Sequence, residues 1–257
     1  MLILLTNDDG IRAPGLVAMY RQLTRLGEVH VVAPATVQSA TGHGITMSAP
    51  LMTARVEVDG AFTGTSVDGR PADCVKLAVA RILPRRPDLV VSGINSGANV
   101  GINVIYSGTV AAAIEAAFLG LPAVAVSLYL RKQIEPDYHQ AAKYALGTIN
   151  QCISSGLRGG QVATINLPVL QPDQEPKGIK VVRQCTRAWP DAYESRKDPR
   201  GREYFWNTGI FTLENAADDT DVAALRDGYI TVTPLQFDLT HESMLRDWAG
   251  RDWSLGQ

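Results

Sequence analysis

Cysteine is scarce in this sequence. The 257 residues include three cysteines, Cys74, Cys152 and Cys185, and no CxxC pair. Such a small and scattered set excludes a disulfide framework and a zinc site built from paired cysteines. Reduced cysteines are usual in the cytosol. We therefore expect three inert thiols in a cytoplasmic protein.

An excess of positive charge is also missing. The chain has 24 Lys and Arg against 26 Asp and Glu, which gives a net charge of −2. Proteins that bind nucleic-acid polymers usually carry a basic excess on one face or tail, so we expect no such partner. With 46 % hydrophobic and 19 % charged residues, the sequence is not that of a mainly disordered chain. A chain of this length buries a large core without disulfide or metal support.

Long apolar runs are absent as well. No stretch reaches the roughly 18 uninterrupted apolar residues that a membrane-spanning helix needs. The N-terminal MLILLTNDDG contains a short apolar run, but no basic residues precede it and Asp8 and Asp9 follow at once. This pattern is typical of a buried strand and not of a signal peptide, so we expect no membrane partner.

What the sequence does contain is an alternation of strand-like and helix-like segments. The strand-like segments are almost wholly apolar, as in parallel sheets that helices cover on both faces. The alternation therefore predicts an α/β protein with a doubly wound, mainly parallel sheet. The expected strands are 2–6, 28–33, 88–92, 123–128 and 162–167, and the expected helices are 14–25, 111–119 and 138–153.

Two segments depart from this rhythm. Residues 51–67 alternate and contain Asp59-Gly60, a pair that favours the tight turn of a hairpin. After Pro168, a polar and proline-rich connector leads to short expected strands at 179–183, 203–206 and 229–233 and a helix at 242–248. We interpret 1–168 as a catalytic core and 169–257 as a β-rich extension of the same domain that serves oligomerisation.

Four loops beside the expected strands carry residues suited to chemistry. In doubly wound sheets, ligands bind beyond the carboxyl ends of the strands, so these loops can converge. In the first loop, the adjacent carboxylates of Asp8 and Asp9 repel each other unless a cation or donors compensate, and hard ions such as Mg²⁺ or Mn²⁺ suit them. Alternatively, one aspartate caps the next helix and the other is solvated.

The second and third loops are rich in glycine, hydroxyl and amide groups. The second, residues 34–44, contains Ser39 and His43, and is otherwise typical of a flexible surface loop. The third, residues 92–103, is either a series of side-chain-capped turns without a ligand or a binding loop, because glycines permit unusual backbone angles and amides supply neutral contacts. Its glycines and asparagines each recur every four residues, at 93, 97 and 101 and at 95, 99 and 103.

The fourth loop, Tyr106-Ser107-Gly108-Thr109, precedes an expected helix. A Ser or Thr there is a routine cap, but free N–H groups at a helix N-terminus also bind phosphate. GxGxxG and GxSxG are both absent, so neither a dinucleotide fingerprint nor a serine-hydrolase elbow is supported. Together the loops indicate metal-assisted hydrolysis of a phosphate ester.

Several segments resemble the SurE family of nucleotidases, the stationary-phase survival proteins. The similarity covers nearly the whole chain, and the NDDG and SGIN…YSGT motifs are highly specific. The similar segments are LLTNDDGIRAPG, GRPADCVKLAV, SGINSGANVGINVIYSGTVAAAIEA, DPRGREYFW and DTDVAALRDGYITVTPLQFDLT.

The resemblance implies a Rossmann-like α/β fold and a phosphatase that needs one divalent metal ion per subunit, Mg²⁺, Mn²⁺ or similar. The implied substrates are nucleoside 5′-monophosphates, often 3′-monophosphates, and in some members short polyphosphate. The C-terminal extension is expected to be exchanged within a homodimer, which in some members pairs into a homotetramer. The implied metal ligands are Asp8, Asp9, Ser39 and Asn95, with Asp8 and Asp9 also catalytic, and the implied phosphate contacts are Asn99, Ser107, Gly108 and Thr109.

The loop after Ser39 departs from the family pattern, which leaves the base preference open. Because His43 lies four residues after Ser39, we hypothesise that its side chain contacts the leaving group or the ribose. Asp9 could also be the general base or the nucleophile.

A phosphatase of the haloacid dehalogenase type needs DxD spacing, which the adjacent Asp8 and Asp9 lack. A non-catalytic nucleotide-binding regulatory protein is the alternative.

Overall fold

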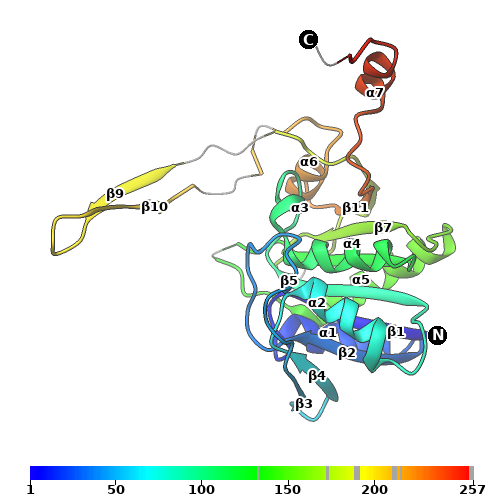
Figure 1. Cartoon of the computed structure of the whole chain (residues 1–257). Coiled ribbons are helices and arrows are strands. Elements are labelled where there is room, and N and C mark those ends of the chain that lie inside the picture. The colour runs from blue at the N-terminus through cyan, green and yellow to red at the C-terminus, as the bar shows by residue number, and fades with distance from the viewer. Residues whose placement is uncertain (132, 172–173, 188–191, 210–212, 215, 255–257) are drawn as a thin grey trace.

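The computed structural model of the chain describes residues 1–131, 133–171, 174–187, 192–209, 213–214 and 216–254. Its centre is a nine-stranded sheet with the order β3-β4-β2-β1-β5-β6-β7-β11-β8 (Figure 1). The strands are β1 (Leu2–Thr6), β2 (Glu28–Pro34), β3 (Thr53–Val58), β4 (Phe62–Val67), β5 (Leu89–Ser96), β6 (Ala123–Leu128), β7 (Val162–Leu167), β8 (Ile179–Val181) and β11 (Ile230–Leu235).

The middle of the sheet is parallel, as predicted. Strands β4, β2, β1, β5, β6 and β7 are parallel to one another. In chain order this arrangement reads 3-2-1-4-5-6, the order of a doubly wound fold whose direction reverses between β1 and β5. Ligands bind beyond the strand ends at that reversal, so the fold places the loops after β1 and β5 at the position expected for a site.

Helices cover both faces of the sheet. Helices α1 (Pro14–Leu23) and α5 (Tyr138–Ser154) pack together on one face. Helices α2 (Pro71–Leu77) and α4 (Gly108–Phe118) pack on the other. Each helix buries an apolar side against the sheet, which confirms the doubly wound α/β prediction.

The hairpin predicted around Asp59 and Gly60 is present as β3 and β4. The two strands are antiparallel, and the turn residues have φ of +48° and +63°. Positive φ at both positions is what the tight hairpin turn requires, and glycine adopts it without a steric penalty. The hairpin joins the sheet through β4, which lies parallel to β2.

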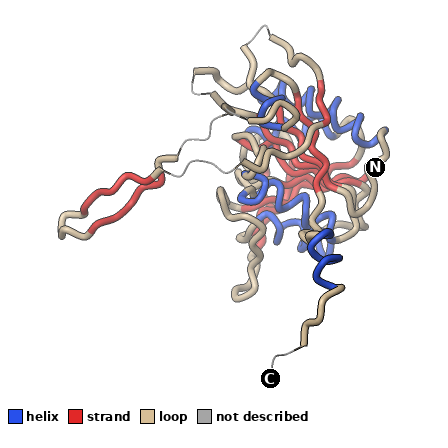
Figure 2. The backbone as a smooth tube through the Cα atoms, turned by 90° about the horizontal axis from the view of Figure 1, so that it is seen from above, coloured by secondary structure: helices blue, strands red, loops and turns tan. Residues whose placement is uncertain are grey.

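The chain after Pro168 contributes to the main sheet as well as leaving it. Strand β11 is antiparallel to β7 and β8 is parallel to β11, so the sheet is mixed at this edge. A separate two-stranded antiparallel sheet, β9 (Tyr193–Lys197) and β10 (Glu203–Asn207), extends away from the body (Figures 1 and 2). The terminal helix α7 (Glu242–Ala249) also leaves the body and has no buried residue.

The apolar side chains of these extensions are exposed. Every residue of β9 and β10 is exposed, including Phe205 and Trp206, as are Leu245 and Trp248 of α7. Monomeric proteins rarely leave such apolar surface uncovered, so a second copy is expected to cover it. Exchange between subunits stays a prediction.

Four helical segments were not predicted from the sequence: α2, the π-helical turn η1 (Ala78–Ile82), α3 (Asn103–Tyr106) and α6 (Asp221–Arg226). Strand β9 was not predicted either. Of the connector expected after Pro168, residues 172–173 lie outside the described residues. Within the described chain, no helix is both long and apolar enough to cross a membrane.

Candidate active site

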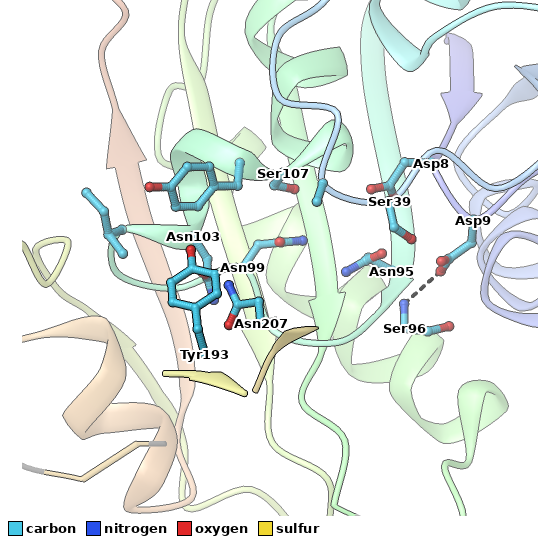
Figure 3. A pocket seen from close by; sticks show the side chains of 13 residues that line it. Asp8, Asp9, Ser39, Asn95, Ser96, Asn99, Asn103, Ser107, Tyr193 and Asn207 are labelled. Atoms are coloured by element: carbon cyan, nitrogen blue, oxygen red, sulfur yellow. Dashed lines mark hydrogen bonds between the residues drawn. The ribbon is translucent and has the colours of Figure 1, made fainter. Parts of the chain in front are cut away.

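A pocket of about 750 Å³ opens at the ends of β1 and β5. It is large enough for a small organic ligand. The structure brings six of the eight predicted site residues to its wall (Figure 3). These six are Asp8, Asp9, Ser39, Asn95, Asn99 and Ser107.

Asp8 is more buried than Asp9, with 6 % of its surface exposed. Its Oδ1 accepts a hydrogen bond from the hydroxyl of Thr109, which is itself fully buried. Burial raises the pKa of Asp8 from its ordinary value to about 6, and the neighbouring charge of Asp9 adds to the rise, whereas the bond from Thr109 opposes it. The site therefore holds a carboxylate whose charge lacks full compensation from the protein.

Gly108 and Thr109 lie behind the pocket wall and do not line it. A Cβ atom at Gly108 would lie 2.9 Å from Cβ and 3.1 Å from Oδ2 of Asp8, so only glycine allows α4 to approach so closely. Thr109 donates its hydroxyl to Asp8, and its backbone N–H also interacts with that carboxylate and lowers its pKa. The predicted roles of both residues as phosphate contacts stay predictions.

Ser107 is the N-cap of α4. Its Oγ accepts a hydrogen bond of 3.1 Å from the N–H of Val110, as the capping interpretation predicts. Ser107 also lines the pocket, so the first turn of α4 and its positive dipole end lie beside the two carboxylates. This end of the pocket is therefore suited to bind a cation at the carboxylates together with an anionic oxygen at the helix N-terminus.

The C-terminal end of β5 holds Asp9 and Asn95 in place. The backbone N–H of Ser96 donates to Oδ2 of Asp9 at 2.8 Å (Figure 3). Nδ2 of Asn95 donates to the carbonyl oxygen of Gly97 at 2.8 Å. The bond through Nδ2 leaves the amide oxygen of Asn95 as the atom suited to the predicted role as a metal ligand. Both aspartates, Ser39 and Asn95 cluster at one end of the pocket (Figure 3).

Asn99 is fixed by a buried polar network. Its Nδ2 donates to Oγ of Ser127 on β6 at 2.8 Å, and its backbone N–H donates to Oδ1 of Asn166 on β7 at 2.8 Å. Asn166 returns a bond to the carbonyl oxygen of Asn99 at 3.2 Å. An amide nitrogen has two N–H groups, so Asn99 keeps one for a ligand in the pocket.

Ser39 reaches the pocket from the loop after β2. The N–H of Gln38 donates to the carbonyl oxygen of Asp8 at 2.8 Å, and the N–H of Gly42 donates to that of Tyr106 at 3.0 Å. These two bonds hold the segment around Ser39 against the site. His43 is not part of the pocket wall and binds Glu115 of α4 instead, so this geometry does not support a substrate contact, which stays an untested hypothesis.

The donor atoms of the pocket fit a hard divalent cation. None of the described residues that line the pocket is Lys, Arg or His, so no protein cation neutralises the two carboxylates. Across the described chain, no three or more His, Cys, Asp or Glu side chains gather into a metal-binding group. The site instead combines two carboxylates with hydroxyl and amide oxygens, which suits an ion that keeps several waters, such as Mg²⁺.

A family model described as "Survival protein SurE" matches residues 3–191. The chain belongs to the SurE family. Two curated SurE relatives, each named "5'-nucleotidase SurE", come from Christiangramia forsetii (44 % identity, 99 % of this chain and 97 % of the relative) and Rhodopirellula baltica (45 % identity, 99 % of each chain). The chain is also similar to the crystal structure of the SurE protein from Aquifex aeolicus, with a TM-score of 0.83, 38 % identity and coverage of 96 % of this chain and 98 % of that one.

Five polar or aromatic pocket residues were not predicted from the sequence. Ser96 and Asn103 lie in the asparagine-rich loop that the sequence did single out, and Tyr106 directly precedes Ser107. Tyr193 and Asn207 come from β9 and β10, beyond the residues that the SurE family model matches. Only the fold brings these two to the pocket, since more than 80 residues separate them from Tyr106 along the chain.

Proposed function

We propose that this chain is a divalent-metal-dependent phosphomonoesterase that hydrolyses nucleoside 5′-monophosphates to nucleoside and phosphate. The observation that carries the proposal is the pair of carboxylates, Asp8 and Asp9, beside the N-terminus of α4, in a pocket whose described wall residues include no basic one. The substrate class is supported by the name of the SurE relatives, "5'-nucleotidase SurE".

Asp8, Asp9, Ser39 and Asn95 would hold the cation, with one ion per subunit. When bound, Mg²⁺ or Mn²⁺ supplies the polarisation of a phosphoryl oxygen and the activation of a water molecule. Thr109 orients Asp8 through its hydroxyl, and the N–H of Ser96 orients Asp9.

The phosphate would lie between the carboxylates and α4. Asn99 donates its remaining amide N–H to one phosphate oxygen, and the first-turn N–H groups of Gly108 and Thr109 favour the negative charge that develops there. Asp9 is less buried than Asp8 and is our candidate for the base that accepts the proton of the attacking water.

Release of inorganic phosphate from AMP tests the function. We expect turnover with Mg²⁺ or Mn²⁺, loss of turnover in EDTA, and recovery when excess metal is returned, because the carboxylates need the cation to accept an anionic substrate. A panel of nucleoside 5′- and 3′-monophosphates and polyphosphate then defines the preferred base, position and metal. AMP binding with no phosphate release under any metal would support the alternative, a non-catalytic nucleotide-binding protein.

Tyr193 and Asn207 would contact the nucleoside. Both lie at the pocket end away from the carboxylates, beside Asn103 (Figure 3). An aromatic ring next to amide groups suits a nucleobase, which stacks and hydrogen-bonds at once; stacking on an aromatic residue contributes about 1–3 kcal/mol per base.

Tyr193→Ala is therefore expected to raise KM for AMP about 10-fold and to leave KM for p-nitrophenyl phosphate within about 2-fold. Steady-state kinetics with both substrates measure this difference. Tyr193→Phe keeps the ring and serves as the control, with KM for AMP close to that of the unsubstituted protein. Equal losses on both substrates would contradict a nucleoside contact.

A further inference from the structure

We propose that His43 and Glu115 are positioning residues for Ser39, which they hold at the metal site by fixing the loop of residues 35–52, called here the Ser39 loop. The inference rests on the proposed function in one respect, namely that Ser39 is a metal ligand. His43 itself does not line the pocket, so its effect is exerted through the loop.

Glu115 is a buried carboxylate that accepts hydrogen bonds from two side chains. It lies on α4 with 4 % of its surface exposed, next to an apolar cluster. Its Oε2 accepts a hydrogen bond from Nε2 of His43 at 2.8 Å, and its Oε1 accepts one from Nζ of Lys76 at 3.1 Å. Burial alone raises the pKa of Glu115, but the bonds from His43 and Lys76 outweigh it and keep the pKa below its ordinary value. Glu115 is therefore ionised, and its hydrogen bonds to His43 and Lys76 compensate the desolvation cost of its buried charge.

The imidazole of His43 is held on a second side. It stacks on the ring of Phe118, with 5.1 Å between the ring centroids and 10° between the planes. Phe118 follows Glu115 by three residues on α4, so both contacts come from the same face of one helix. His43 thus attaches the loop to α4 by a hydrogen bond and a stacking contact.

The Ser39 loop depends on such contacts for its shape. It has no helix or strand between Pro34 and Thr53, and Ala40 and Gly42 have φ of +55° and +57°. Ser39 lies between the backbone bonds of Gln38 and Gly42, and the next attachment along the chain is His43. Loss of that attachment leaves no bond to α4 between Gly42 and Thr46, whose N–H donates to Asp73 of α2 at 2.9 Å. Ser39 is then expected to occupy more positions.

Helix α4 links this anchor to the other side of the metal site. The helix begins at Gly108 and Thr109, which contact Asp8, and carries Glu115 two turns later. One rigid element therefore fixes Asp8 at its start and the Ser39 loop through His43. Residues that orient a metal ligand commonly change metal affinity by about 10- to 100-fold when they are substituted. A salt bridge that served stability alone would leave metal affinity unchanged.

The test compares Mn²⁺ binding by the full-length protein, measured by calorimetry without substrate, across three variants. His43→Phe keeps the stacking on Phe118 but cannot donate to Glu115, and is expected to weaken Mn²⁺ binding about 10-fold. His43→Gln keeps a donor and is expected to recover most of the affinity. His30→Ala removes a similar His–Glu pair, His30 with Glu28 at 2.7 Å on β2, and is expected to bind Mn²⁺ as the unsubstituted protein does.

Two further measurements separate positioning from other effects. At saturating Mn²⁺, kcat of His43→Phe with AMP is expected within about 2-fold of the parent value, because the loss lies in metal affinity. Without metal, hydrogen exchange at the amides of Gln38 and Gly42 is expected to be faster in His43→Phe than in His30→Ala, and this readout does not need an active enzyme.

The inference is overturned when His43→Phe binds Mn²⁺ as tightly as the parent, or when the Gln38 and Gly42 amides exchange at the parent rate. It is also overturned when His43→Gln loses as much affinity as His43→Phe. Failure of the proposed function has a different signature: the parent protein itself binds Mn²⁺ without releasing phosphate from any substrate.

Discussion

Asp8→Asn is expected to abolish phosphate release and, at the same time, to stabilise the metal-free protein above pH 6. The substitution removes a proposed metal ligand, and metal polarisation of a phosphoryl oxygen is worth several kcal/mol of transition-state stabilisation. Since each 1.4 kcal/mol is about tenfold in rate, turnover is expected to fall by about 10³-fold or more. Asparagine keeps the size of the side chain and an oxygen that can accept the bond from Thr109.

The gain in stability follows from the sign of the pKa change. Burial raises the pKa of Asp8 from 3.8 to about 6, so the folded state favours the protonated carboxyl. The corresponding stability is present below about pH 4 and is lost as the pH rises through about 6. At pH 8 without metal, the ionised group costs about 3 kcal/mol relative to its protonated form. Asparagine at position 8 is neutral and avoids this cost.

Unfolding by urea between pH 4.5 and 8 in EDTA measures the effect. We expect the free energy of unfolding of Asp8→Asn to depend less on pH than that of the parent and to be larger at pH 8. Added Mn²⁺ is expected to raise the free energy of unfolding of the parent but not of the variant. Asp59→Asn makes the same chemical change at an exposed hairpin turn and should alter neither activity nor pH dependence. The same pH dependence in Asp8→Asn and the parent would show that Asp8 is not the group that titrates.

Local sequence patterns predicted the elements that make the site possible. The bounds of β1 and β7 match the predicted ones, because each is an apolar run that ends in clear breakers or polar residues. The side chains of Asp8 and Asn95 converge because parallel strands that flank a reversal of strand order end at the same edge. Polar residues at the ends of apolar strands were therefore sufficient to predict which residues cluster at the end of the pocket where we propose that a metal binds.

Contacts across long chain separations were beyond that reasoning. Thr109 binds Asp8 over 101 residues, and His43 binds Glu115 over 72, and no local pattern encodes either partner. The direction of β11 was also open, because a long connection allows a strand to join the sheet in either direction. Tyr193 reaches the pocket from a hairpin outside the parallel core, so its side chain gave no local signal of a binding role.

Helix α2 was not predicted for a different reason, its short length. Pro71 and Asp73 are good helix-start residues: proline occupies the first turn, and the carboxylate of Asp73 accepts the N–H of Arg70 at 2.9 Å. The helix has seven residues before the π-helical turn, too short for a clear apolar period. Asp73 also binds the N–H of Thr46 at 2.9 Å, so this short helix fixes the far end of the Ser39 loop.

Gly108→Ala is expected to lower kcat about 100-fold or more, although it adds only one methyl group and alanine forms helices more readily than glycine. The added Cβ would lie 2.9 Å from Cβ of Asp8 and 3.2 Å from Cγ of Pro71. Neither neighbour can move freely, because Asp8 is held by Thr109 and Pro71 is a rigid ring at the start of α2. Displacement of Asp8 or of the first turn of α4 would separate the proposed metal ligands from the N–H groups proposed to bind phosphate, and small misplacements of this kind cost about 10²-fold.

Gly147→Ala on α5 is the matched control, since a Cβ there would meet no atom within 4 Å. It is expected to stabilise the protein by about 0.5–1 kcal/mol and to leave kcat unchanged, because alanine is the better helix former. Kinetics at saturating Mn²⁺ and thermal unfolding of both variants measure the contrast. Full activity in Gly108→Ala would mean that the close approach of α4 to Asp8 is not needed for catalysis. A loss confined to Gly108→Ala would instead place the cause at that contact, because helix propensity predicts a loss from neither substitution.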